Sequence, residues 1–303
     1  MPKRPKIDPV RAPTLFEMDK LETSSAPTNI LEIEPPYSEP GLLLGTSSFT
    51  ATGWQGTFYP VGMKPPEYLS FYATRFKTVE IDSTYYGPPS ASTVMGWRDK
   101  TPPDFIFAAK VPQIITHEKV LLDCESEWDQ FLETMDVLGD KLGPLVFQFP
   151  FFDRWRFPKQ KDFLAVLAPF LKKLPRDHKF AIEIRNKTWL DAAFADLLRE
   201  RKVALVLQDL SSMPRPWAFK EEFDFVTADF TYIRWLGDRK GIEELTKTWN
   251  KTVVDRRGDL VNWVELFRQF VSRNLKVYAY ANNHYSGNGP GTVKLFWELY
   301  NRK

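Results

Sequence analysis

Residues 79–84 read VEIDST, and this stretch decides the fold because its apolar and polar residues alternate strictly. Alternation with period two indicates a β-strand whose two faces meet different surroundings. Val79 and Ile81 share one face, whereas Glu80 and Asp82 share the other. In a barrel of parallel strands the helices cover the outer face, which must be apolar, so the polar face points inward. The stretch therefore predicts a barrel strand that carries acidic side chains into the barrel.

Further strand-like segments follow a regular plan on both sides of this stretch. The eight predicted strands lie at 42–49, 78–86, 105–112, 145–150, 180–186, 203–210, 230–237 and 277–284. Helical spacing separates most of them, at 66–76, 127–142, 163–174, 191–201 and 261–274, and a last helix is predicted at 293–300. The sixth connection, 211–224, is proline-rich and irregular.

This alternation predicts an α/β protein with a single (β/α)8 TIM-type barrel over residues 41–303. The segment matches the ~250 residues of such barrels. A doubly wound open sheet is the main alternative, but no GxGxxG motif follows the first strand.

Composition sets the class of protein. The 303 residues are 43% apolar, enough for a full core, and a net charge of +2 makes no general demand for a nucleic acid or an acidic membrane. Cys124 is the single cysteine, which fits a reducing compartment. With neither an apolar leader nor a stretch long enough to span a membrane, the sequence predicts a soluble cytoplasmic protein without membrane attachment.

The first forty residues differ from the rest. Residues 1–40 hold eight of the 24 prolines and no glycine, and their apolar residues show no period. We expect a disordered tail. An alternative is a docking segment for an unknown protein at 14–21, where Leu15, Phe16 and Met18 could anchor.

Polar residues that alternation directs into the barrel gather at the C-terminal ends of the strands, where barrel enzymes keep their sites. They are Glu80, Asp82, Lys110, Gln148, Glu183, Arg185, Gln208, Arg234, Asn282 and His284. The acidic and basic members balance. Two interpretations follow: a structural layer of ion pairs, or a ligand-facing mouth, which we favour because buried charges are costly unless paired or solvated.

Several motifs resemble one family. The stretches GTSSF, GWQGTFYP, FKTVEIDSTYYGPPS, LGPLVFQFP, AIEIRNKTW, YIRW and VYAYANNHYSGNGP occur in the order found in the YecE-like family, the domain of unknown function 72. The resemblance runs from about residue 41 to 300. It implies a TIM-type barrel of uncharacterised activity. Suggestions for the family's function rest on the similarity of its fold to endonuclease IV-like and sugar-isomerase-like barrels.

The resemblance also marks positions. Residues that match the family pattern are Glu80, Lys110, Thr116, His117, Gln148, Glu183, Arg185, Trp189, Arg234, Asn282, Asn283 and His284. Two departures stand out. Ser48 replaces a glycine after the first strand, and Trp235-Leu236-Gly237 follows Arg234 where the family tends to have a His-Gly pair.

The catalytic candidates are Glu80, Lys110, His117 and Glu183. Lys110 could form a Schiff base or donate a proton, or could be a plain countercharge for the carboxylates. His117 could serve as an acid or base, although a lone loop histidine is often incidental. Glu183 could be a base beside Arg185, or its ion-pair partner.

Ligand-binding candidates are Gln148, Arg185, Arg234, Asn282, Asn283, His284, Gly287 and Gly289. The glycines precede a predicted helix, whose first N–H groups are unpaired and favour an anion. We expect neither a cofactor nor a metal, since Lys110, Arg185 and Arg234 would repel a cation.

These features favour an enzyme acting on a small anionic or phosphorylated, sugar-like substrate at the mouth of the barrel, although catalysis itself stays open. The alternative is a protein that binds or processes nucleic acid with the same mouth, in line with the endonuclease IV-like analogy.

Overall fold

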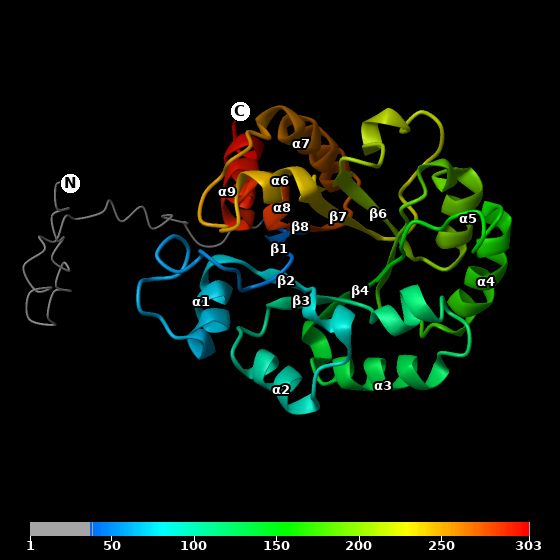
Figure 1. Cartoon of the computed structure of the whole chain (residues 1–303), viewed down its shortest axis with the longest axis horizontal. Helices are drawn as coiled ribbons and strands as arrows, with labels where there is room; N and C mark the ends of the chain where they lie inside the picture. Colours follow the sequence, from blue (N-terminus) through cyan, green and yellow to red (C-terminus); the bar gives the residue numbers. More distant parts are fainter. Residues whose placement is uncertain (1–36, 38, 303) are drawn as a thin grey trace, which may run out of the picture.

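The eight strands form one parallel sheet in the order β1-β8-β7-β6-β5-β4-β3-β2. The chain is seen here as a computed structural model that describes residues 37 and 39–302 (Figure 1). The strands are β1 (Leu42–Thr46), β2 (Thr78–Ile81), β3 (Ile106–Lys110), β4 (Leu142–Gln148), β5 (Phe180–Glu183), β6 (Ala204–Leu210), β7 (Phe230–Gly237) and β8 (Lys276–Ala281). The barrel and its eight strands are confirmed. The predicted tail falls almost wholly on residues outside the described part.

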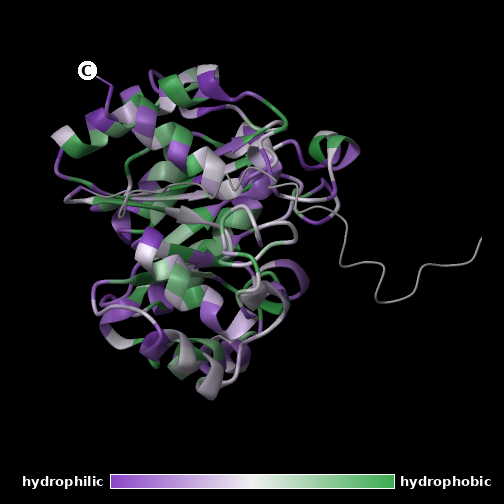
Figure 2. Ribbon diagram, turned by 90° about the vertical axis from the view of Figure 1, so that its left-hand side faces the viewer, coloured by the Kyte–Doolittle hydropathy of each residue, from purple (hydrophilic) through white to green (hydrophobic). Residues whose placement is uncertain are grey.

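Helices surround the strands on all sides (Figure 1). They are α1 (Tyr68–Arg75), α2 (Ala91–Asp99), α3 (Glu125–Asp136), α4 (Gln160–Lys173), α5 (Ala192–Glu200), α6 (Arg239–Leu245), α7 (Arg257–Ser272), α8 (Asn283–Ser286) and α9 (Gly289–Tyr300). Hydrophilic residues recur along these outer helices (Figure 2). In the described chain, the irregular connection 211–224 contains only the 3-10 turn Pro216–Ala218. No helix of the described residues is long and apolar enough to cross a membrane.

The barrel interior is filled asymmetrically. Small side chains, such as Ala108 and Ala181, line one side, and aromatic rings from β7 and β8 fill the opposite side. The ring centroids of Tyr232 and Tyr280 lie 5.1 Å apart. A barrel of eight strands leaves an interior that side chains can just fill, so large rings compensate for the alanines opposite them. This packed layer forms the floor beneath the polar mouth.

The seam between β1 and β2 is joined by a side chain. The described strands show no backbone ladder between β1 and β2. Instead, the Tyr72 hydroxyl accepts from the N–H of Thr46 at 2.9 Å and donates to the carbonyl oxygen of Thr78 at 3.2 Å. A Cβ at Gly45 would lie 2.2 Å from that carbonyl oxygen. Glycine thus lets the two strands approach, and Tyr72 links their backbones.

Candidate functional site at the barrel mouth

The predicted inward-facing side chains do reach the C-terminal end of the barrel. Glu80 and Glu183 are fully buried, and Arg234 is only 2% exposed. Parallel pairing sets Gln148 beside Glu183 on neighbouring strands and Gln208 beside Arg234. The alternation that predicted this arrangement holds because the small and aromatic residues on the same faces pack the interior one layer below.

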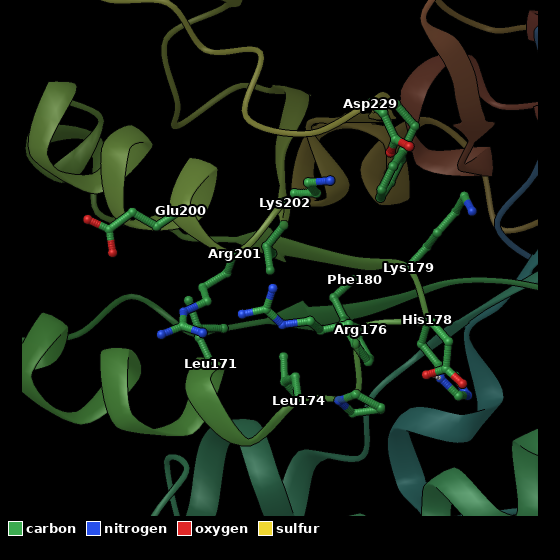
Figure 3. Close-up of a pocket in the computed structure, with 14 residues that line it drawn as sticks. Leu171, Leu174, Arg176, His178, Lys179, Phe180, Glu200, Arg201, Lys202 and Asp229 are labelled. Atoms are coloured by element: carbon green, nitrogen blue, oxygen red, sulfur yellow. Dashed lines mark hydrogen bonds and ion pairs between the residues drawn. The ribbon is translucent and has the colours of Figure 1, made fainter.

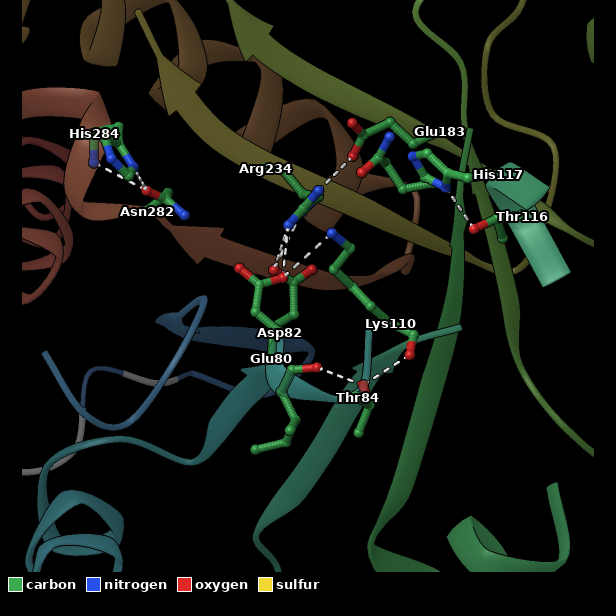
Figure 4. Close-up of polar contacts among 12 residues, drawn as sticks. Glu80, Asp82, Thr84, Lys110, Thr116, His117, Glu183, Arg234, Asn282 and His284 are labelled. Atoms are coloured by element: carbon green, nitrogen blue, oxygen red, sulfur yellow. Dashed lines mark hydrogen bonds and ion pairs between the residues drawn. The ribbon is translucent and has the colours of Figure 1, made fainter. Parts of the chain in front are cut away.

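Arg234 is the centre of a buried ion cluster (Figure 4). Its Nη1 lies 2.8 Å from Oε2 of Glu183, and its Nη2 lies 2.8 Å from Oε1 of Glu80 and 3.1 Å from Oδ1 of Asp82. The Tyr232 hydroxyl donates to the second oxygen of Glu80 at 2.6 Å. One guanidinium, with five donors in a rigid fork, thus holds together carboxylates from β5 and from β2 and its end, although the two strands lie three places apart in the barrel.

Glu183 links the buried cluster to the surface of the mouth. Its other oxygen forms an ion pair with Arg185, whose side chain is 20% exposed. Burial alone would raise the pKa of Glu183, but Arg185 and Arg234 outweigh it and hold that pKa below its ordinary value. Glu183 is therefore ionised at neutral pH and fixes both guanidinium groups. A free catalytic base would need a looser environment.

Lys110 and Asp82 form a looser pair at the top of the cluster. Their Nζ and Oδ1 atoms are 3.9 Å apart, and Nζ lies 4.3 Å from the ring centroid of Tyr85. Burial lowers the pKa of Lys110, and the charge of Arg234 lowers it further. Burial and the charge of Glu80 raise the pKa of Asp82 to about 6. The pKa values of Lys110 and Asp82 thus shift toward each other, which favours exchange of a proton between the two groups.

A cavity of about 440 Å³ opens above these residues. Its charged lining residues are Asp82, Lys110, Arg185, Arg234 and Arg239. Gln148, Asn282, Tyr85 and Tyr86 also face it. A second hollow of about 570 Å³ adjoins it, sharing Gln148, Arg185 and Leu210 and reaching Phe151 and Lys187. The mouth is therefore a groove that starts over the ion cluster and continues toward Phe151 and Lys187.

His117 lies in a single π-helical turn, Ile114–Glu118, after β3. Its Nδ1 is 2.8 Å from the Thr116 hydroxyl, and its ring packs edge-on to Tyr85 at 5.1 Å between centroids. Burial, followed by the charges of Lys110 and Arg185, lowers the pKa of His117 to about 4. The imidazole is therefore neutral at pH 7 and lies beside the ring over which Lys110 sits.

Of the three polar residues after β8, Asn282 and His284 lie together at the cavity, whereas Asn283 points elsewhere. Oδ1 of Asn282 lies 2.6 Å from Nδ1 of His284, whose Nε2 is 3.1 Å from Glu243 of α6. Asn282 and His284 line the cavity. Asn283 instead uses its Oδ1 to accept from the indole N–H of Trp54 at 3.2 Å. Asn283 therefore joins the β1 loop to the end of β8.

The glycine loop before α9 is buried. A Cβ at Gly287 would lie 2.7 Å from Val253 and 2.8 Å from the carbonyl oxygen of Lys251. The N–H of Gly289 donates to Oδ1 of Asn283 at 2.8 Å, and the side chain of Asn288 caps the helix. Gly287 and Gly289 do not line the cavity, and the N–H groups of Gly287, Gly289 and Gly291 each donate to a group of the protein itself.

Some mouth residues escaped the sequence analysis. Arg239 and Glu243 lie on α6, which was not predicted, although Asp238 caps this helix and is followed by a run of charged residues. The carboxylates of Glu80, Asp82 and Glu183 all contact Arg234, and the described residues contain no group of three or more His, Cys, Asp or Glu arranged to hold an ion.

The opposite end of the barrel has another hollow, of about 240 Å³ (Figure 3). Its basic lining residues are Arg176, Lys179, Arg201 and Lys202, and its acidic ones are Asp177, Glu200 and Asp229. Charges of both signs thus nearly cancel there. Barrel enzymes keep their sites at the C-terminal end, so the mouth rather than this hollow is the candidate site.

Fold and site together define a (β/α)8 barrel protein with a charged cavity at its C-terminal mouth. Residues 43–303 match the family described as protein of unknown function DUF72, and the chain belongs to that family. The YecE protein of Escherichia coli K12 is 32% identical over 118 residues, 39% of this chain and 41% of that protein. The YunF protein of Bacillus subtilis is 29% identical over 151 residues, 47% of this chain and 52% of that protein.

These alignments span about half, or less, of the length of the two relatives. Solved structures extend the likeness of the fold. A DUF72 family protein from Thermotoga maritima matches with a TM-score of 0.65 at 24% identity, over 85% of this chain and 97% of that one. One from Enterococcus faecalis matches with a TM-score of 0.61 at 22% identity, over 86% and 96%.

Proposed function

We propose that this protein is an enzyme that binds a small anionic substrate in the mouth cavity. The charge of the cavity wall supports this most directly. Lys110, Arg185, Arg234 and Arg239 face the cavity as cations, and Asp82 is the carboxylate that faces it. The other two carboxylates of the cluster are fully buried beneath. An anion entering the mouth therefore meets more cations than carboxylates on the wall itself, while the carboxylates that balance Arg185 and Arg234 lie behind them.

The neutral groups of the wall suit a hydroxylated substrate. The amides of Gln148 and Asn282 can donate to and accept from hydroxyl groups, and Tyr85 and Tyr86 offer ring faces of the kind that stack on sugars. A phosphorylated or carboxylated sugar carries both features, and the cavity volume suits a molecule of that size.

The buried and exposed members of the cluster have different roles. Glu80 and Glu183 hold Arg234 and Arg185 in place and act as positioning residues. Lys110 and Asp82 face the substrate and exchange protons. His117 packs against the same tyrosine ring, and its lowered pKa makes it only a weak proton acceptor at pH 7.

A binding experiment tests this proposal. Inorganic phosphate and phosphorylated sugars should raise the melting temperature of the full chain, because a ligand at 100 times its Kd stabilises the folded state by about 2.7 kcal/mol. Arg185→Met should remove most of this rise. Arg199→Met, on the outer helix α5, should leave it intact. Equal responses from both variants would refute an anion site in the mouth.

The rim gives the nucleic-acid alternative its own support. Phe151 is 67% exposed, and Tyr86 and Trp155 are each 81% exposed. Exposed rings beside cations are typical of proteins that stack the bases of single strands. Salt separates the two functions. A single-stranded oligonucleotide that binds the protein through several of its phosphates should lose roughly a thousandfold in affinity between 50 and 200 mM salt. A small anion should lose far less.

A further inference from the structure

We propose that Lys110 forms an imine with its substrate: Nζ adds to the carbonyl carbon of an anionic aldehyde or ketone held in the mouth cavity. This inference rests on the proposed function and names the substrate class and the reacting atom.

Within the described part of the chain, Lys110 lacks the close carboxylate contact that a lysine serving only to neutralise a carboxylate would make. Its Nζ has no hydrogen-bond acceptor among the described residues, with Asp82 at 3.9 Å and the face of Tyr85 at 4.3 Å. By contrast, Lys119 lies 2.5 Å from a carboxylate oxygen of Glu127, and Lys141 donates to two backbone carbonyl groups. A nitrogen with no direct acceptor faces the cavity and can approach a carbonyl carbon.

The cluster stays neutral when Lys110 loses its proton. In unit charges, Arg234 and Arg185 balance Glu80 and Glu183, although Arg234 also contacts Oδ1 of Asp82 at 3.1 Å. The remaining pair, Lys110 and Asp82, can be ammonium with carboxylate or amine with carboxylic acid. Both states have the same total charge, so a proton can pass between the two without leaving a net charge in a poorly solvated site. The neutral amine is the nucleophile that imine formation needs.

The reaction balances without any oxidant or reductant. The Nζ lone pair forms the C–N bond while the carbonyl π pair moves to oxygen, which takes a proton from the Asp82 carboxyl group. The ammonium nitrogen of this adduct then returns one proton to the Asp82 carboxylate, which passes it to the hydroxyl group; the hydroxyl group leaves as water, and the nitrogen lone pair forms the C=N bond of the iminium. Arg185 and Arg239 line the same cavity and would hold the anionic group of the substrate.

Pyridoxal 5′-phosphate, an aldehyde that carries a phosphate, is the probe for this reaction. The full chain is incubated with it, reduced with borohydride, digested and mapped by mass spectrometry. We expect the reduced adduct on Lys110, at roughly tenfold the level on any other lysine because the cavity holds the reacting groups together. Lys110→Arg should remove this adduct, and Lys119→Arg should leave it.

The wild-type map decides the outcome even if Lys110→Arg does not fold. In the intact chain, excess inorganic phosphate should suppress labelling of Lys110 but not of Lys119. Labels spread evenly over surface lysines would overturn the imine role of Lys110. If phosphate still raised the melting temperature through Arg185 in that case, the proposed function would stand without the imine. If Lys110 is labelled equally by pyridoxal without phosphate, and Arg185→Met changes nothing, the imine role holds and the anion preference fails.

Discussion

Replacing Arg234 with methionine should destabilise the protein strongly. The guanidinium touches three carboxylates, two of them fully buried. Removing one partner of a buried ion pair costs about 3–5 kcal/mol, because the charge that remains has neither water nor a counterion. A protein of this size loses roughly 2–4 °C of melting temperature per kcal/mol. We therefore expect a fall of about 6–20 °C at pH 7.

The penalty should shrink as the pH falls from 7 to 5. In the variant, Asp82 loses the charge of Arg234, which lowers its pKa in the wild type, so the folded pKa of Asp82 rises further above the unfolded one, whereas Glu183 keeps its ion pair with Arg185. A group of that kind binds a proton on folding, and stability returns as the pH drops through its folded pKa. In the wild type the pKa of Glu183 is lowered, so its contribution stays complete over this range and is lost only at lower pH.

Urea unfolding followed by circular dichroism at both pH values measures this effect. Arg239→Met is the matched control, since that side chain is 77% exposed and pairs with Glu243 on one helix face. Such a surface pair contributes at most about 0.5 kcal/mol. A loss below about 1 kcal/mol in Arg234→Met, or a penalty that is identical at pH 5 and 7, would refute the buried ion cluster.

Three further predictions concern other parts of the molecule. Tyr72→Phe should cost about 1–3 kcal/mol in urea unfolding, because the N–H of Thr46 loses its buried partner at the β1–β2 seam; an unchanged midpoint would contradict the bridge. Sulfate, which does not titrate between pH 5 and 7, should bind the mouth roughly tenfold more tightly at the lower pH as Asp82 is neutralised. Calorimetry should show no such trend in Asp82→Asn. Deleting residues 1–36 should shift the melting temperature by only a few degrees, since Tyr37, which packs against the barrel, is retained; a large fall would show that the tail packs there too.

The sequence predicts the barrel well because strand phase is a local property. Each strand shows the alternation on its own, so Glu80, Lys110, Glu183 and Arg234 could be assigned to the interior one strand at a time. Which of them meet is a different question. Arg234 contacts Glu80 across 154 residues of chain, and that contact exists only after the barrel has curved round on itself. Charge balance indicated a cluster without revealing that Arg234 is its centre.

Short helices were the weaker part of the prediction. The helix α2 buries only Val94, so its apolar stripe is too thin to be seen as a period. Its start does have a local signal, since Ser90 accepts from the N–H of Thr93 at 3.2 Å. The helix α6, which brings Arg239 to the cavity, likewise begins at a capping aspartate. Capping residues were better evidence than hydrophobic periodicity in both connections.

The glycine loop shows why one pattern can have two causes. Glycine permits the close approach of any group, and at Gly287 that group is the segment around Val253 rather than a ligand. The consequence for recognition is chemical. A cradle of helix N–H groups would select a phosphate by its geometry, whereas the ammonium and guanidinium groups of Lys110 and Arg185 attract carboxylates and phosphates alike. Ligands tested on the mouth should therefore include hydroxylated carboxylic acids beside sugar phosphates, and the rigid fork of Arg185 should favour planar, bidentate anions among them.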